Sequence, residues 1–321
     1  MTATQIASKT NPGVVDITST LGFSRATAEG TGMVLTPNGE VLTNNHVIEG
    51  ATSISVRDVG NDHTYKAKVV GYSNSNDVAV LQLQGASGLQ TVSIGSSARL
   101  APGQPVVALG NAQGRGGIPS VATGRVTGLG AMITAQNEGS GTFEHLSGMI
   151  RTNAPIQPGD SGGPLVNAAG KVIGMDTAAS SAGSGPGTTA AMATQAFAIP
   201  IDKAIQLADQ IEAGTSSSTV HIGASAFLGV AISSQSQQGG FGQPSAGATI
   251  QGVIPGTPAA QAGMSQGDTI VAVDGQQITS SSDLQSVMQL HHPADKVTVT
   301  WIDQAGQSHT SRVTLVAGPA G

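Results

Sequence analysis

The sequence predicts a mainly β protein that is divided into two domains. The chain has 321 residues, which exceeds the usual size of one domain, and 45 of them are glycine. Apolar residues make up 38% of the chain, which is enough to build folded cores, although aromatic residues make up 2%. Many short apolar runs separated by glycine turns are typical of β-rich domains.

Charge and composition exclude several classes of protein. The net charge is −6 and the Lys and Arg residues are scattered, so nucleic acid is not an expected partner. The chain has no cysteine, and its seven histidines lack ligand-like spacing, so we expect neither disulfides nor a metal or other cofactor. No apolar run is long enough to span a bilayer, and the first residues, MTATQIASKTNPG, lack the pattern of a secretory signal. This leaves either a cytosolic protein or one whose leader has been removed.

The first two hundred residues alternate between short strands and glycine turns. The runs are partly β-branched and bounded by Gly, Pro, Asn or Asp, as strands of a sandwich or barrel are. They are residues 32–35, 78–81, 106–109 and 172–175. Pro37-Asn38-Gly39 predicts a hairpin, because proline fixes one turn dihedral and Asn-Gly tolerates positive φ, and residues 167–170 repeat the device.

A helix closes the first domain. Ile201, Ile205, Ala208 and Ile211 recur at helical spacing, with proline just before the first of them and glycine three residues after the last. The Ser/Thr stretch that follows reads as a linker. We therefore predict a first domain at 1–213, a linker at 214–219 and a second domain at 220–321.

The second domain also reads as β-rich, with two short helices. Its predicted strands are residues 252–254, 270–273 and 296–301, and its predicted helices are 258–262 and 282–290. Two longer polar or glycine-rich segments of the first domain, 131–145 and 178–193, are expected to be mobile loops, and loops of that length are often functional.

The strongest chemical signal is the string GDSGGP at residues 159–164. A serine hydroxyl is a poor nucleophile until a base removes its proton, and the tetrahedral intermediate needs donors for its oxyanion. Glycines on both sides let the backbone turn sharply and expose Ser161, while the amides of Gly159 and Ser161 point at one place. The string predicts a nucleophilic serine, against the alternative of a glycine turn with an incidental serine.

A base and an orienting acid are available upstream. His46 follows an apolar strand in TNNHVI, and Asp77 stands at the head of a predicted buried strand in NDVAVL. Each alone could be structural, as a strand-end histidine or a strand-start cap. Asp58 and Asp62 are rival acids, but neither leads into an apolar strand.

The order His, Asp, Ser is that of the chymotrypsin-type arrangement, in which two β-barrels hold the triad at their junction. The three strings in this order predict a mainly β, chymotrypsin-like double β-barrel. An esterase is a weaker alternative, because a nucleophile elbow requires a helix after the serine, whereas another strand is expected here.

Through these strings and several others, the chain resembles the high-temperature-requirement (HtrA, Deg-type) serine proteases. TNNHVI, NDVAVL, GDSGGPLVN, GMDTA and FAIP carry the resemblance in the first domain, and FLGV, GVIPGTPAAQAG and GDTIVAVDGQQI resemble the PDZ domain of that family. The resemblance runs from about Asn11 to Leu315, and is strongest to secreted or surface actinobacterial members with one PDZ domain.

The resemblance implies a catalytic triad of His46, Asp77 and Ser161, with the Gly159 and Ser161 amides as the oxyanion hole. It places Ile156 in the primary specificity pocket, which implies cleavage after small or medium aliphatic residues. It also implies ATP-independent degradation of unfolded or damaged proteins outside the cytoplasm, whether secreted, periplasmic or at the cell envelope. The polar loops from Ala131 and Ala178 match the family's regulatory loops, which order the oxyanion hole when a peptide or partner binds.

In the PDZ domain, the backbone amides of Phe227, Leu228, Gly229 and Val230 are expected to hold the terminal carboxylate of a peptide that adds as a strand. Glycine suits the close approach of a ligand to the backbone. The alternative is that the FLGV run is simply core.

The chain departs from the family pattern in two places. Many members have Asn where this chain has Asp160; digestive trypsins have Asp there, paired with a freed N-terminal amine, but no activation peptide is evident here. The family often forms a homotrimer through an aromatic N-terminal segment, which here contains only Phe23. A competing function is a peptide-binding scaffold or chaperone-like holdase with weak or gated proteolysis.

Overall fold

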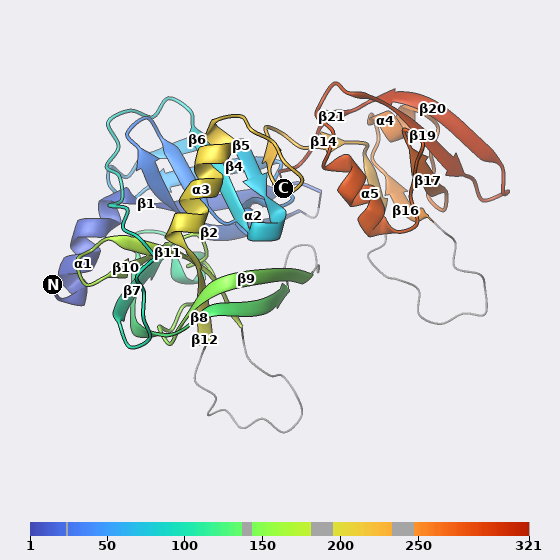
Figure 1. The fold of residues 1–321 in the computed structure, drawn as a ribbon. Coiled ribbons are helices and arrows are strands. Elements are labelled where there is room, and N and C mark those ends of the chain that lie inside the picture. The colour runs from blue at the N-terminus through green and yellow to red at the C-terminus, as the bar shows by residue number, and fades with distance from the viewer. Residues whose placement is uncertain (24, 137–142, 181–194, 233–246, 321) are drawn as a thin grey trace. The chain divides into compact units, whose positions relative to one another are not determined.

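The structure is a computed structural model that describes residues 1–23, 25–136, 143–180, 195–232 and 247–320. The chain forms two compact units, Met1–Ile222 and Gly223–Ala320, and strands predominate in both (Figure 1). The predicted mainly β fold is confirmed. In the described residues, no helix is long and apolar enough to cross a membrane.

The first half of the first unit is a ring of six strands. Strand β5 pairs with both β4 and β6, which closes the order β5-β4-β1-β2-β3-β6. The strands are β1 (Val14–Leu21), β2 (Ala26–Thr36), β3 (Glu40–Thr43), β4 (Ser53–Asp58), β5 (Thr64–Ser73) and β6 (Val78–Leu83). A helix, α1 (Ala3–Thr10), precedes them, and its Thr2 cap and Gln5 form a capping box. The hairpin predicted at residues 37–39 joins β2 to β3.

The second half is a closed barrel of six strands in the order β10-β11-β12-β9-β8-β7. The strands are β7 (Pro105–Gly110), β8 (Ser120–Gln136), β9 (Phe143–Thr152), β10 (Pro164–Asn167), β11 (Val172–Ser180) and β12 (Gln195–Pro200). Residues 106–109 and 172–175, which the sequence predicted as strands, lie in β7 and β11. The predicted chymotrypsin-like double β-barrel is confirmed.

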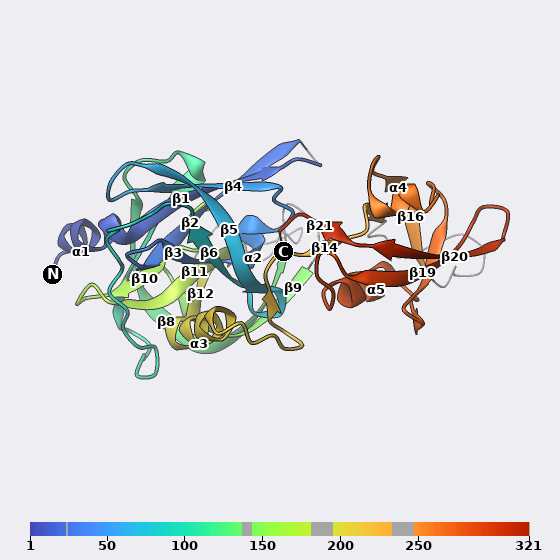
Figure 2. The same cartoon turned by 90° about the horizontal axis from the view of Figure 1, so that it is seen from above.

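The helix predicted after Pro200 is α3 (Ile201–Glu212), which packs against strands of both barrels, β5, β6 and β11 (Figures 1 and 2). Its buried face joins the shared apolar core, and Gly214 follows it in a left-handed conformation.

The first unit continues past the linker that the sequence predicted at 214–219. Strand β13 (His221–Ile222) pairs with β5, and the His221 ring stacks on Tyr72 with the ring centroids 4.9 Å apart. The first unit therefore continues to Ile222, beyond the predicted start of the second domain at 220. Nothing in the Ser/Thr-rich sequence marks this docking, which an aromatic stack, a two-residue ladder and the buried Val220 side chain stabilise.

The prediction of mobile loops needs correction where the structure describes them. Residues 131–136 and 143–145 lie in β8 and β9, which pair along their length, with Ile133 opposite Leu146. Residues 178–180 end β11. The strands persist because partly buried Ala131 and Ile133 alternate with exposed Met132 and Thr134, a period of two. The rest of both predicted loops, 137–142 and 181–193, lies outside the described residues.

The second unit has an antiparallel sheet of six strands, a separate pair of antiparallel strands and two helices. Its strands are β14 (Ala226–Phe227), β15 (Val230–Ile232), β16 (Ala248–Val253), β17 (Thr269–Val273), β18 (Gln276–Gln277), β19 (Lys296–Ile302), β20 (Ser308–Thr314) and β21 (Val316–Ala317). Its helices are α4 (Pro258–Gln261) and α5 (Ser281–Met288). Leu284, Val287 and Trp301 belong to its separate apolar core, and Asp274-Gly275 forms the hairpin turn between β17 and β18.

Candidate active site

The histidine of TNNHVI lies on a one-turn helix, α2 (Asn45–Ile48), that directly follows β3. The sequence predicted only a strand end here. The buried Asn44 side chain donates to the Asp77 main-chain carbonyl at 2.9 Å, which fixes the start of this turn. The His46 side chain is 24% exposed, so one edge of the ring reaches the surface while the other faces Asp77.

The Asp77 carboxylate is completely buried and accepts three hydrogen bonds. His46 Nδ1 lies 2.9 Å from Oδ2, the His46 main-chain N–H donates to Oδ1 at 3.0 Å, and Thr177 Oγ1 donates to Oδ2 at 2.8 Å. Asp77 ends a short 3₁₀ turn, Asn74–Asn76, with φ +53°, a left-handed conformation that Asp tolerates better than most residues. The contacts fix the carboxylate against the ring.

The two rival acids lie in other contacts. Asp58 caps a turn by accepting from the N–H groups of Gly60 and Asn61. Asp62 is exposed and forms an ion pair with Arg57. Of the three candidate acids, Asp77 is the one in contact with His46.

The Ser161 turn is attached to the first barrel by its backbone. The Thr31 N–H on β2 donates to the Ser161 carbonyl at 2.8 Å, and Thr31 Oγ1 donates to the Gly159 carbonyl at 2.6 Å. Thr43, three residues before His46, donates in turn to the Thr31 carbonyl at 2.7 Å. These contacts bring the serine turn of the second barrel to the end of β3, where α2 begins.

The Gly159 and Ser161 amides are available for a ligand. Neither N–H donates a hydrogen bond to any other residue that the structure describes. The Pro158 carbonyl accepts from the Gln113 N–H at 2.7 Å, and in a trans peptide the following Gly159 N–H points the opposite way. Gly159 has φ +93°, and a side chain there would collide with the Asn111 carbonyl, so glycine is required.

A second buried carboxyl lies behind the turn. The main chain of Asp176 on β11 pairs with Gly162 and Gly163, each bond being 2.8 Å long. Its side chain is fully buried, and neither carboxyl oxygen has a hydrogen-bond partner among the described residues. Burial raises the pKa of Asp176 well above its ordinary value, and the nearby Asp160 charge adds to the rise.

This raised pKa predicts a pH dependence of stability. Unfolded Asp176 ionises at the ordinary value of 3.8, whereas the folded chain keeps the proton to higher pH. The folded state then binds more protons, so the free energy of unfolding contributed by this group falls as pH rises above the unfolded pKa. Asp176→Asn removes that loss. We expect its melting temperature to match the wild type most closely near the unfolded pKa and to exceed it by a few degrees at about pH 8. A difference that stays constant across this range would contradict the protonated carboxyl.

Ile156 lies within the apolar interior of the second barrel. It is 3% exposed and belongs to a cluster that includes Ala154, Val106 and Ala198. The structure therefore surrounds this position with apolar residues of the barrel core and leaves almost no exposed surface on Ile156 itself.

The FLGV segment of the second unit has the same kind of available donors. The Leu228 and Gly229 carbonyls accept from the N–H groups of Ala259 and Ile254, both at 2.9 Å. The N–H groups of Leu228 and Gly229 donate to no other described residue. Gly229 has φ +91° and lies against Thr257, which leaves no room for a side chain. Leu228 is 3% exposed, so its side chain is core while its amide is available.

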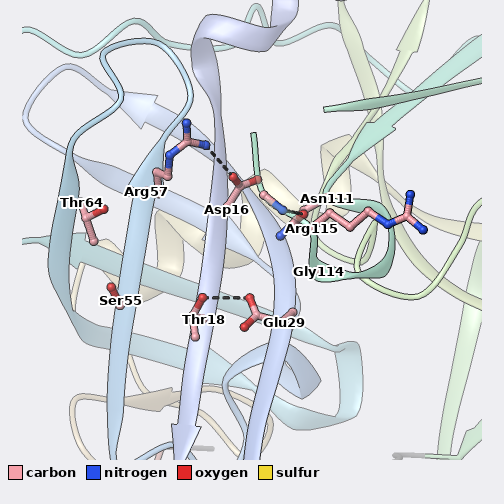
Figure 3. Close-up of a pocket in the computed structure, with 10 residues that line it drawn as sticks. Asp16, Thr18, Glu29, Ser55, Arg57, Thr64, Asn111, Gly114 and Arg115 are labelled. Atoms are coloured by element: carbon pink, nitrogen blue, oxygen red, sulfur yellow. Dashed lines mark hydrogen bonds and ion pairs between the residues drawn. The ribbon is translucent and has the colours of Figure 1, made fainter. Parts of the chain in front are cut away.

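A polar pocket of about 250 Å³ opens on the outside of the first unit and does not include His46, Asp77 or Ser161. Figure 3 shows Arg57 directed at Asp16, and Thr18 directed at Glu29, along its wall. Asn111, Gly114, Arg115 and Gly116 form part of the lining. The main-chain N–H of Gln113, between them in the sequence, donates to the Pro158 carbonyl.

Sequence reasoning missed three hydroxyl residues that hold the site. These are Thr31, Thr177 and Ser120, of which the last donates to Asp160. Thr177 stands in the GMDTA string, which contributes to the family resemblance but does not by itself predict a hydrogen bond to Asp77. Serine and threonine are common in this chain, so a single hydroxyl gives no pattern to find.

The comparisons with known proteins agree with this architecture. The family description "Trypsin-like peptidase domain" matches residues 30–175, and "PDZ domain" matches residues 226–310. "Serine protease PepD" of Mycobacterium tuberculosis is 34% identical over 324 residues, covering 97% of this chain and 65% of that protein. The "Probable periplasmic serine endoprotease DegP-like" of Marinomonas sp. is 34% identical over 293 residues, covering 90% of this chain and 57% of that protein.

Solved structures give the same result. "HtrA-type protease AlgW with tripeptide" has a TM-score of 0.54 and 27% sequence identity, with 100% of this chain and 99% of that chain covered. Both domain matches follow the order in which the two units occur along the chain. The chain therefore has one trypsin-like peptidase domain followed by one PDZ domain, and it is similar to HtrA-type serine proteases, although it spans less than two thirds of the length of the two curated relatives.

Proposed function

We propose that the chain is an ATP-independent serine endopeptidase whose triad is His46, Asp77 and Ser161. The observation that carries the proposal is the buried Asp77 carboxylate, which accepts from both the ring and the main chain of His46. A carboxylate at Nδ1 keeps the proton on that nitrogen, so Nε2 has a lone pair available to act as a base.

The reaction follows from these placements. His46 removes the proton from Ser161 Oγ as the oxygen attacks the peptide carbonyl, and later gives that proton to the leaving amine. Asp77 stabilises the imidazolium that forms between these steps. Thr177 orients the Asp77 carboxylate by donating a hydrogen bond of 2.8 Å to it. The Gly159 and Ser161 N–H groups supply the donors for the oxyanion.

Substrate preference is proposed from Ile156. The apolar cluster around this residue suits an apolar side chain, so small or medium aliphatic residues are favoured before the cut. Exposed segments of unfolded or damaged proteins would be the substrates. Relatives named as periplasmic proteases support an extracytoplasmic location.

The PDZ domain is proposed to bind peptide C-termini. A carboxylate needs several hydrogen-bond donors. The Leu228 and Gly229 N–H groups lack partners among the described residues and would supply two of them. HtrA-type structures solved with a tripeptide and a decapeptide support peptide binding in relatives. Peptide binding here would regulate cleavage, and the polar loops are proposed to take part. A homotrimer also remains a proposal; Phe23, the aromatic residue expected at such an interface, is 55% exposed.

A pair of peptides tests the carboxylate contact. A fluorescent peptide with a free apolar C-terminus is expected to bind the chain, and the same peptide with an amidated C-terminus is expected to bind at least about tenfold more weakly, because charge-assisted hydrogen bonds are lost. Fluorescence anisotropy measures both affinities. Equal affinities would show that the FLGV amides do not hold a carboxylate.

Digestion of casein tests the proposed activity itself. We expect cuts after Val, Ala or Ile, read by mass spectrometry, and a fluorophosphonate probe bound covalently at Ser161. The competing function is a holdase with gated proteolysis, which the available PDZ donors also allow. A chain that prevents aggregation of unfolded casein, yet cuts nothing and takes up no probe even with C-terminal peptides added, would favour the holdase.

A further inference from the structure

The carboxylate that precedes Ser161 is buried and held by two uncharged donors. Asp160 is 2% exposed. Ser120 Oγ donates to its Oδ1 at 2.9 Å, and the Gln157 N–H donates to its Oδ2 at 2.9 Å. Ser120 begins β8, so the first bond joins the nucleophile turn to a separate strand of the second barrel.

No cation compensates this charge among the described residues. The ion pairs of the described chain do not include Asp160. Burial raises the pKa of Asp160, and the hydrogen bonds from Gln157 and Ser120 oppose that rise. A buried carboxylate that loses a donor is costly, so each of the two bonds constrains where the carboxylate lies.

The position of the Asp160 side chain fixes the conformation of the turn. The Asp160 N–H donates to the Gln157 carbonyl at 3.0 Å while its carboxylate accepts from the Gln157 N–H, so Asp160 closes the segment 157–160 on itself. Within that closed segment, the Pro158–Gly159 peptide carries one of the two proposed oxyanion donors. The Ser120 hydroxyl is the side-chain contact that anchors this closed segment to β8.

We propose that Ser120 is a positioning residue for the peptidase reaction, acting through Asp160 to hold the Gly159 and Ser161 N–H groups in place for the oxyanion. The inference rests on the proposed function of Ser161. It assigns to a neutral hydroxyl on β8 the stabilisation of a buried carboxylate next to the nucleophile. Ser120 itself is half-buried, so its replacement is compatible with the fold.

The test compares Ser120→Ala and Ser120→Thr with a matched control. Ser96→Ala removes a hydroxyl that donates to the exposed Asp202 carboxylate at 3.0 Å, the same type of bond at a carboxylate outside the site. For Ser120→Ala we expect kcat to fall on the order of tenfold with KM little changed, since a hydrogen bond to a charged group is lost. The threonine variant should recover most of the rate, and Ser96→Ala should match the wild type.

A peptide boronic acid with a C-terminal valine analogue separates positioning from a general loss of structure. Boron forms a tetrahedral adduct with the serine oxygen, so its affinity reports the oxyanion donors. Ser120→Ala should weaken this affinity by about the same factor as kcat. Unchanged boronate affinity and unchanged kcat would overturn the proposal, as would a fall in kcat that merely follows the fraction of folded protein.

Hydrogen exchange distinguishes failure of this inference from failure of the proposed function. If the wild type neither cuts casein nor binds the boronate, the proposed function of Ser161 is wrong. In that case, amide hydrogen exchange of residues 157–161 still tests the contact between Ser120 and Asp160. Faster exchange in Ser120→Ala than in Ser96→Ala supports the contact, and equal exchange overturns it.

Discussion

Replacing Ser161 by alanine is expected to reduce the rate of casein cleavage by about 10⁶-fold, because the oxygen that attacks the carbonyl is removed and water must replace it without a positioned nucleophile. The folded state should be retained. The main-chain contacts of the turn, from Thr31 to the Ser161 and Gly159 carbonyls, do not involve the serine side chain. Cleavage is measured by release of peptides from casein, and folding by the melting temperature.

Ser53→Ala is the matched control for this variant, because Ser53 is an exposed serine at the start of β4 in the other barrel. It should retain wild-type cleavage. If the rate of cleavage by Ser161→Ala were within about tenfold of the wild-type rate, Ser161 would not be the nucleophile. The inactive variant should still bind unfolded casein and C-terminal peptides, because neither the PDZ donors nor its fold depends on the hydroxyl.

Replacing His46 by alanine is expected to reduce kcat by about 10⁶-fold at neutral pH, a loss close to that of the serine variant. The base is removed, and the Asp77 carboxylate loses the ring N–H that satisfied it. Asp77 keeps its hydrogen bonds from the His46 main chain and from Thr177, so the variant should remain folded. The loss should not add to that of Ser161→Ala in a double variant, because the two residues act as a unit.

His63→Ala is the control, since His63 is exposed in the turn before β5 and contacts neither Asp77 nor the serine turn in any contact the structure describes. Initial rates on a fluorogenic peptide, with melting temperatures for each variant, check the prediction. If His46→Ala retained more than about a hundredth of the wild-type kcat, His46 would not be the general base.

Local strings predicted the residues that we propose carry the chemistry. A string as rich in glycine as GDSGGP can bend sharply and expose its serine. Residues 159–164 therefore predicted a turn with an accessible serine from local sequence alone. TNNHVI and NDVAVL identified a histidine and an acid at strand ends, although each could have been structural alone. The chymotrypsin-like architecture followed from the order of the three strings and from the short apolar runs around them.

Other features of the structure depended on contacts that local sequence does not encode. The short helix under His46 and the docking of His221 on Tyr72 were missed, because their partners lie far along the chain, as when Asn44 reaches Asp77 across 33 positions. The mobile loop predicted at 131–145 was wrong where the structure describes it, because β8 and β9 pair with each other there. The role of Ile156 in substrate specificity remains a prediction, and its side chain is buried in the structure.

The sequence by itself determined the fold class and singled out the residues proposed as reactive groups, because turn chemistry and hydrophobic runs act between near neighbours. Only the tertiary structure decided how those groups are held. Thr177 reaches Asp77 across 100 positions and Thr31 reaches Gly159 across 128, while Ser120 reaches Asp160 across 40. A hydroxyl becomes a specific donor only where tertiary packing brings it to an acceptor oxygen, and that distance is a property of the folded chain.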